Sequence, residues 1–159
     1  MHNVTYEGTK KPVIALDLIE LNCSAKTWEE AVLCAGMLLV NHGYAENIYI
    51  NAMLKSVNEL GPYIVIYPGF ALPHAKLEKG VFHTGLSFIR LKKPVYFPKK
   101  SDDPVHTIIA LCTNGSRDHI KTLQKIALIF RNERLIDTLQ KSKNKEVIFD
   151  LLNIKLGCS

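Results

Sequence analysis

Apolar and polar positions follow two different periods along this 159-residue chain. Apolar residues recur three and four positions apart within 31–39, 48–57 and 120–130, and this spacing places them on one face of a helix. Short runs rich in β-branched and other apolar residues occupy 63–69 and 105–113, which is typical of strands. Strands that alternate with helices predict an α/β fold, in which a mixed β-sheet is flanked by helices on both faces.

Residues at the ends of these segments predict where the helices begin and end. Thr27 and Glu30 form a capping-box pattern ahead of the first helix, and Gly43 lies where a glycine would end it. A second helix is expected over 44–60, up to the Gly-Pro pair that follows it. The helix that follows the last strand is expected to begin with Ser116 as its N-cap.

The other segments are less sharply defined by their patterns. Residues 13–21 fit either a strand or a short helix, and 81–97 fit either two strands or one strand bent near Pro94. Two further helices are expected at 132–142 and 146–153, with a solvated basic loop between them. No internal repeat and no linker interrupts the chain.

Composition narrows the class of protein. A chain of this length fits one domain, residues 1–159, and its 47% hydrophobic content predicts a folded globule. The four cysteines form no C-x-x-C pair, so we expect no structural zinc and reduced thiols in a cytoplasmic protein. The longest apolar run, 31–40, is too short to span a bilayer, and the N-terminus lacks the pattern of a secretory signal. The net charge of +5 accompanies basic clusters without interleaved aromatics, so we expect no nucleic-acid partner.

The histidines are the candidates for chemistry, because the chain contains no P-loop, no G-x-S-x-G and no H-E-x-x-H motif. His74 follows Pro73, whose ring fixes φ and makes the peptide stiff, and Gly69 allows a close approach or an unusual dihedral just before. A histidine on a stiff loop at a strand end suits a nucleophile or a ligand. From this pattern alone, a partly exposed loop histidine without a role is the alternative.

His119 is the second candidate. It lies in the first turns of a predicted helix, directly after a buried strand. Such a junction offers unpaired backbone N–H groups and the positive end of the helix dipole, and both favour a phosphate. The alternative is a histidine on the helix surface, paired with Asp118.

The stretch "PYIVIYPGFALPHAKLEKGV" resembles the active-site region of enzyme IIA proteins of the phosphoenolpyruvate-dependent sugar phosphotransferase system. The signature of the mannitol/fructose superfamily, roughly G-x-A-[ILM]-P-H, corresponds here to Gly69 through His74. The later block "VHTIIALCTNGSRDHIKTLQKIA" resembles the second block of the family, a buried strand followed by a histidine on a helix. Within the superfamily, "GPYIVI" followed by "ALPHA" is most similar to the L-ascorbate-type branch.

This resemblance implies a phosphotransferase that acts as a phosphoryl carrier and needs neither a metal nor a cofactor. His74 is expected to be the phosphorylated nucleophile, which receives the group from the phosphocarrier HPr. The group then passes to a cysteine of the cognate EIIB, and through it to a sugar taken up by the membrane protein EIIC. His119 is expected to stabilise the phosphoryl oxygens, and the second ring nitrogen of His74 to donate to a backbone carbonyl.

Two departures and two alternatives accompany the resemblance. Asn58 stands where mannitol-type members often place an arginine, and the chain is basic where such proteins are more often acidic or neutral. One alternative is a regulatory EIIA-like module, phosphorylated on His74, that controls a partner protein by contact. The other is a metal-dependent enzyme that uses both histidines. A shallow apolar docking surface around His74 is expected to include Phe70, Leu72 and Leu77.

Overall fold

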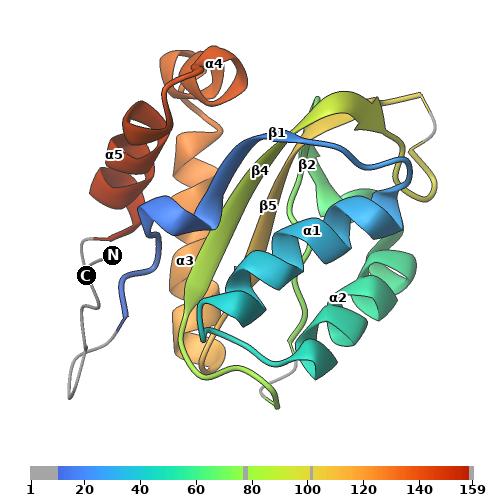
Figure 1. The fold of residues 1–159 in the computed structure, drawn as a ribbon, viewed down its shortest axis with the longest axis vertical. Helices are drawn as coiled ribbons and strands as arrows, with labels where there is room; N and C mark the ends of the chain where they lie inside the picture. The colour runs from blue at the N-terminus through green and yellow to red at the C-terminus, as the bar shows by residue number, and fades with distance from the viewer. Residues whose placement is uncertain (1–10, 77–78, 101, 158–159) are drawn as a thin grey trace.

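A mixed sheet of five strands forms the centre of the computed structural model, which describes residues 11–76, 79–100 and 102–157 (Figure 1). The β1–β4 and β5–β3 pairs are parallel, whereas the β4–β5 and β3–β2 pairs are antiparallel. In spatial order, the strands are β1 (Ile19–Cys23), β4 (Gly85–Val95), β5 (Val105–Cys112), β3 (Phe70–Ala71) and β2 (Val65–Tyr67).

Helices cover both faces of this sheet, which confirms the predicted fold class. One layer comprises α1 (Trp28–Asn41) and α2 (Asn47–Leu60), and the other comprises α3 (Ser116–Ile129), α4 (Glu133–Lys141) and α5 (Lys145–Leu156) (Figure 1). Two short 3-10 helices, η1 (Leu16–Leu18) and η2 (Gly61–Ile64), lead into β1 and β2.

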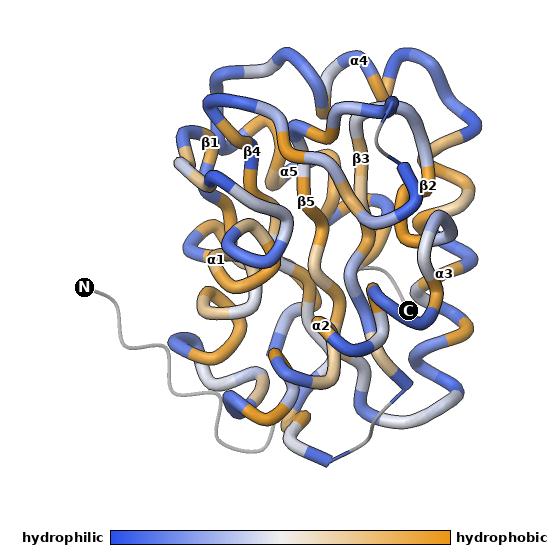
Figure 2. Tube along the Cα trace, turned by 90° about the vertical axis from the view of Figure 1, so that its right-hand side faces the viewer, coloured by the Kyte–Doolittle hydropathy of each residue, from blue (hydrophilic) through white to orange (hydrophobic). Residues whose placement is uncertain are grey.

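The core lies between the sheet and its two helical layers. Every residue of β5 is buried except the half-buried His106, because helices cover both faces of this central strand. Hydrophobic positions follow the strands and the inner sides of the helices, while hydrophilic positions concentrate on the outer turns (Figure 2). The apolar residues at 105 and 108–112 therefore encode a buried strand, as the sequence predicts.

The ends of α1 confirm the capping signals. The Thr27 side chain accepts a hydrogen bond from the Glu30 amide at 3.2 Å. At the other end, the Gly43 amide donates to Val40 at 3.1 Å and the Tyr44 amide donates to Leu39 at 2.9 Å. This pair of bonds is the Schellman arrangement that closes a helix at a glycine.

Some other predicted boundaries were wrong, and the structure settles the two alternatives that the sequence left open for 13–21 and for 81–97. The second helix begins at Asn47 instead of residue 44, because Ala45 forms a bridge with Val81. Residues 63–69 are a strand only over Val65–Tyr67, since 61–64 form η2. The 81–97 segment contains one strand, whose register shifts between Arg90 and Val95, around the exposed Pro94. The basic loop is shorter than predicted, and the segment 13–21 contains both η1 and the start of β1.

Gly69 makes the turn from β2 into β3. Its φ is +91°, and its carbonyl accepts hydrogen bonds from the amides of His106 and Thr107 at 3.0 and 3.1 Å. A Cβ at this position would lie 2.4 Å from Nε2 of His106. Both expected uses of this glycine, an unusual dihedral and a close approach, are therefore confirmed.

Gly69→Ala is expected to lower the free energy of unfolding by about 2 kcal/mol or more, because it adds backbone strain and a clash with His106. Urea unfolding would measure the change. Gly115→Ala is the matched control: φ is +101° there, but a Cβ would meet nothing within 4 Å. Equal losses of stability in the two variants would contradict the contribution of the clash.

Candidate active site

His74 is held by an extended segment that continues β3 alongside β5. The Leu72 amide donates to the Ile64 carbonyl at 2.8 Å, and the Leu111 amide donates to the Pro73 carbonyl at 3.0 Å. Pro73 lacks an amide proton and takes part in the sheet only through its carbonyl. The backbone is therefore fixed on both sides immediately before the half-buried His74.

The tautomer of His74 follows from its hydrogen bond. Its Nδ1 lies 2.6 Å from the Leu72 carbonyl oxygen. Because a carbonyl can only accept, Nδ1 carries the proton and Nε2 keeps a free lone pair in the neutral ring. Burial lowers the pKa of His74, the bond to Leu72 opposes this shift, and the charge of Lys76 adds to it. The expected bond to a backbone carbonyl is confirmed, and the neutral ring has one nucleophilic nitrogen.

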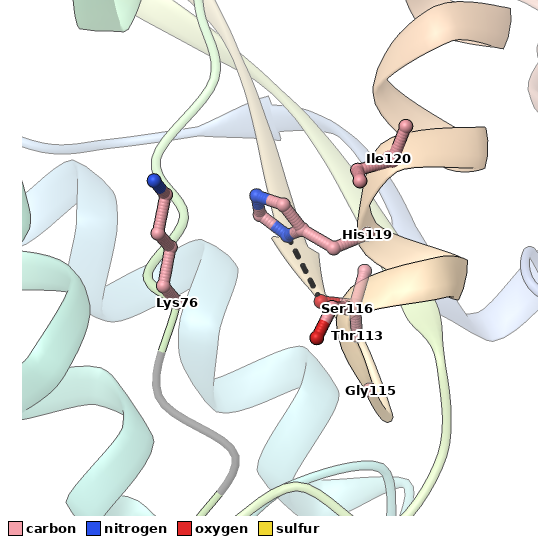
Figure 3. Close-up of a pocket in the computed structure, with 6 residues that line it drawn as sticks. All are labelled: Lys76, Thr113, Gly115, Ser116, His119 and Ile120. Atoms are coloured by element: carbon pink, nitrogen blue, oxygen red, sulfur yellow. Dashed lines mark hydrogen bonds between the residues drawn. The ribbon is translucent and has the colours of Figure 1, made fainter.

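The structure brings His119 beside His74. The two ring centroids are 5.5 Å apart, and His119 is buried in the first turns of α3. Its Nδ1 lies 3.0 Å from the Thr113 hydroxyl, while its other nitrogen points into the space between α3 and Lys76 (Figure 3). Asp118 instead accepts a hydrogen bond from Thr84 at 2.8 Å. The alternative of a surface histidine paired with Asp118 is therefore wrong.

Thr113 influences what His119 can offer. A threonine hydroxyl can donate, so Nδ1 can accept and leave the ring proton on Nε2. Burial is the largest cause that lowers the pKa of His119. The charges of His74 and Lys76 lower it further, so all three causes favour the neutral ring. A neutral His119 in this tautomer is a hydrogen-bond donor toward the cleft, while His74 provides a lone pair.

His119 opens into a cleft of about 210 Å³, which is lined by Lys76, Thr113, Gly115, Ser116, His119 and Ile120 (Figure 3). The sequence predicted Ser116 as the N-cap of α3, and this was wrong, because Ser116 is the first helical residue. Gly115 takes the N-cap position with φ +101°, ψ 157°, and it supplies no side-chain cap. The positive end of the α3 dipole is therefore available to an anion in this cleft.

A short network holds the β5–α3 turn in place. The Asn114 amide donates to the Thr84 hydroxyl at 3.0 Å, and the Asn114 side chain donates to the Phe82 carbonyl at 3.3 Å. Since Thr84 also donates to Asp118, the turn and the first turn of α3 are joined to the segment before β4. Sequence reasoning missed Thr84, because nothing in its local pattern links it to residues some thirty positions away.

Tyr49 was also missed. This buried α2 phenol accepts a hydrogen bond from the Ala75 amide at 3.1 Å and donates to the Leu111 carbonyl at 2.6 Å. It joins α2 to β5 and to the residue that follows His74. Burial raises the pKa of Tyr49 and keeps the phenol protonated. Its only signal in the sequence is a tyrosine on the apolar face of a helix, which usually indicates packing.

The predicted docking surface was wrong in two of its three residues. Phe70 and Leu72 are 0% and 3% exposed. The Phe70 ring contacts Tyr67, His106 and Phe130, with ring centroids 6.2, 5.5 and 5.0 Å away, because β3 is an interior strand of the sheet. The third residue, Leu77, lies outside the described residues. Among the exposed apolar residues, Ile120 lines the cleft.

Other candidate groups do not join this site. Cys112 is buried as predicted, and burial raises the pKa of its thiol to about 12. Asn58 is exposed on α2, where its amide donates to the Leu54 carbonyl of its own helix at 3.4 Å. Among the described residues, no group of three or more His, Cys, Asp or Glu side chains could hold a metal ion. None of the helices in the described ranges is long and apolar enough to cross a membrane.

Two neutral imidazoles lie beside a helix N-terminus without a side-chain cap, an arrangement that suits an anionic group, and comparisons with known proteins show the family of the chain. Residues 12–155 match the family model of the phosphoenolpyruvate-dependent sugar phosphotransferase system, EIIA 2. The chain belongs to this family. Its members are phosphotransferases that act as phosphoryl carriers.

The similar proteins extend over most of the chain. The ascorbate-specific PTS system EIIA component of Escherichia coli K12 is 36% identical over 136 residues, which cover 85% of this chain and 88% of that protein. The enzyme IIA of an E. coli complex of mannitol enzyme IIA with phosphorylated enzyme IIB has a TM-score of 0.76 at 27% identity, covering 87% and 96%. The nitrogen regulatory protein IIA-Ntr of Neisseria meningitidis has a TM-score of 0.75 at 25% identity, covering 88% and 96%.

The lowered pKa of His74 predicts how stability and reactivity depend on pH. As pH falls through about 6.5, unfolded histidines bind protons that the folded ring does not, so stability decreases. Phosphoryl acceptance should persist below this pH and fall only as the folded ring protonates. An NMR titration of the imidazole C–H resonances should place His74 below the ordinary histidine value, and His74→Asn should raise the pKa of His119. A titration midpoint of His74 at or above the ordinary value would contradict this assignment.

Tyr49→Phe is expected to lower the free energy of unfolding by about 1–3 kcal/mol, because the buried Ala75 amide and Leu111 carbonyl lose a partner. Urea unfolding would measure the loss. Tyr63→Phe removes the same hydroxyl from a side chain that is 80% exposed and should change stability by less than about 0.5 kcal/mol. Tyr49→Phe with unchanged stability would show that the two hydrogen bonds contribute nothing.

Proposed function

We propose that His74 accepts a phosphoryl group from the phosphohistidine of HPr and passes it to a cysteine of a cognate EIIB in the cytoplasm. EIIB then phosphorylates a sugar, L-ascorbate or a related carbohydrate, as it enters through EIIC. The observation that carries this proposal is the free Nε2 of His74, which the bond from Nδ1 to Leu72 leaves unprotonated in a ring whose centroid lies 5.5 Å from that of His119.

Each transfer exchanges one bond to phosphorus for another. The Nε2 lone pair of His74 attacks phosphorus, a new P–N bond forms, and the P–N bond to the donor histidine breaks with its electron pair returning to that ring. In the second step, the EIIB thiolate attacks, a P–S bond forms, and His74 regains its lone pair. Positioning and charge stabilisation are the main requirements of such chemistry.

His119 and α3 supply part of that stabilisation. A proton on Nε2 of His119 can donate to a phosphoryl oxygen, and the open N-terminus of α3 offers backbone amides and a partial positive charge. His119 therefore acts on the phosphoryl group without bonding to phosphorus. Removing one such donor commonly slows a reaction by about 100-fold or more in a water-excluded site, and the effect should be smaller in this open cleft.

The partner and the sugar are proposed from the similar proteins. An EIIB partner is supported by the solved complex of mannitol enzyme IIA with phosphorylated enzyme IIB. L-ascorbate is supported by the name of the E. coli relative. A regulatory module phosphorylated on His74 is the second candidate, since the nitrogen regulatory IIA-Ntr shares this fold. The two candidates differ in whether the phosphoryl group reaches an EIIB.

Incubation with enzyme I, HPr and labelled phosphoenolpyruvate should label the protein in an acid-labile, base-stable linkage. His74→Ala should abolish the label, because the accepting nitrogen is lost. His119→Ala should retain some label and slow transfer to an ascorbate-type EIIB. His42→Gln is the control, since His42 bonds the Leu38 carbonyl at the end of α1.

Full labelling of His74→Ala would show that another residue accepts the group. Labelling on His74 without transfer to any EIIB would favour the regulatory module.

A further inference from the structure

We propose that Lys76 is a further catalytic residue of this site, whose ammonium group donates hydrogen bonds to the oxygens of a phosphoryl group on His74. The inference rests on the proposed function of His74 and adds a residue to it. Lys76 would be the cation that neutralises the charge that the group carries through the transfer.

The extended backbone places Lys76 on the same side as His74. Side chains two residues apart along an extended chain share a face, and the one between them points the other way. The burial pattern follows this alternation, because His74 is half-buried, Ala75 is 7% exposed against the core, and Lys76 is exposed. Tyr49 fixes the alternation by holding the Ala75 amide.

Lys76 and His119 line the same cleft from opposite sides. Figure 3 shows Lys76 across the opening from His119, whose outward nitrogen points toward the Lys76 side. The Lys76 charge is also among the causes that lower the pKa of both His74 and His119. The ammonium group therefore shares a cleft with His119 and lies close enough to both rings for its charge to act on them.

The electrostatics of the site call for a cation. A phosphate ester carries between about one and a half and two negative charges at neutral pH, and a phosphohistidine presents a similar dianion. A neutral His119 and a helix terminus worth about half a charge do not balance it. Ser116 and Thr113, the polar neutral side chains of the cleft lining, offer hydroxyls and no charge. Lys76 is the charged residue among those that line the cleft.

The Lys76 ammonium is not committed elsewhere in the described part of the chain. The ion pairs recorded there join Lys55 to Glu59, Lys100 to Asp103 and Lys141 to Asp137. A lysine is a compact point charge with three donors on a flexible stem, so it can follow a phosphoryl group that arrives from one partner and leaves to another.

The test compares Lys76→Met, Lys76→Arg and Lys79→Met in transfer from phospho-HPr, with kcat and KM measured separately. Lys76→Met should lower kcat by about 10- to 100-fold with little change in KM, because the contact is made to the transferring group. Lys76→Arg keeps a cation and should remain within about threefold of wild type. Lys79→Met removes an equal charge from the same loop and should leave kcat unchanged.

A second readout follows the phosphorylated protein directly. A cation beside the phosphoryl group favours its dianion, so Lys76→Met should shift the midpoint of its ³¹P NMR titration upward, by up to about one unit. A merely structural role for Lys76 would not move this midpoint.

The outcomes separate this inference from the proposed function. Label confined to His74, together with a wild-type kcat and ³¹P midpoint in Lys76→Met, would overturn the role of Lys76 alone. A raised KM at constant kcat would also overturn it, since Lys76 would then only attract the partner. Label that persists in His74→Ala would overturn both assignments.

Discussion

The hydrogen bond from Nδ1 of His74 to the Leu72 carbonyl is the interaction on which the chemistry of this site depends. A neutral imidazole has one basic nitrogen lone pair, and this bond assigns it to Nε2. The bond requires the Leu72 carbonyl and the His74 ring to keep a fixed relative position, although one residue separates them. Pro73 between them supplies that rigidity, since its φ cannot relax.

Contacts from the sheet and from α2 also hold this geometry in place. Leu111 in β5 is connected to the residues on both sides of His74. Its amide donates directly to the Pro73 carbonyl, and its carbonyl accepts from the Tyr49 phenol, which in turn accepts from the Ala75 amide. His74, the proposed phosphoryl acceptor, is thus held beside the central strand β5, and Tyr49 ties the same segment to α2. Sites supported by strands in this way keep a more accurate geometry than sites on free loops.

The sequence predicts the parts of this arrangement that depend on local chemistry. The apolar residues of β5, the caps of α1 and the turn at Gly69 each follow from neighbouring residues, and the Pro73–His74 motif predicts the phosphoryl acceptor through family resemblance. The contacts that complete the site join residues far apart in the chain, such as Tyr49 to Leu111 and Thr84 to Asn114. No local pattern encodes these contacts, because a tyrosine or threonine occupies the same sequence position whether it only packs or also holds another residue in place. The same limit explains the error at Phe70, which follows a turn in the sequence but lies on an interior strand.

A phosphoryl carrier requires a site that stabilises the phosphoryl group but still releases it to the next protein. A buried guanidinium in a fixed fork would hold a phosphoryl dianion strongly, and release to the next partner would be slow. This cleft instead combines the neutral imidazole of His119, a helix terminus and an exposed lysine, and water weakens each of these interactions. In the transfer proposed above, a partner that covered the cleft would place the same groups at lower dielectric, where their attraction for the phosphoryl charge increases. The stabilisation is therefore greatest while donor and acceptor are both present, which is the condition under which a carrier must act.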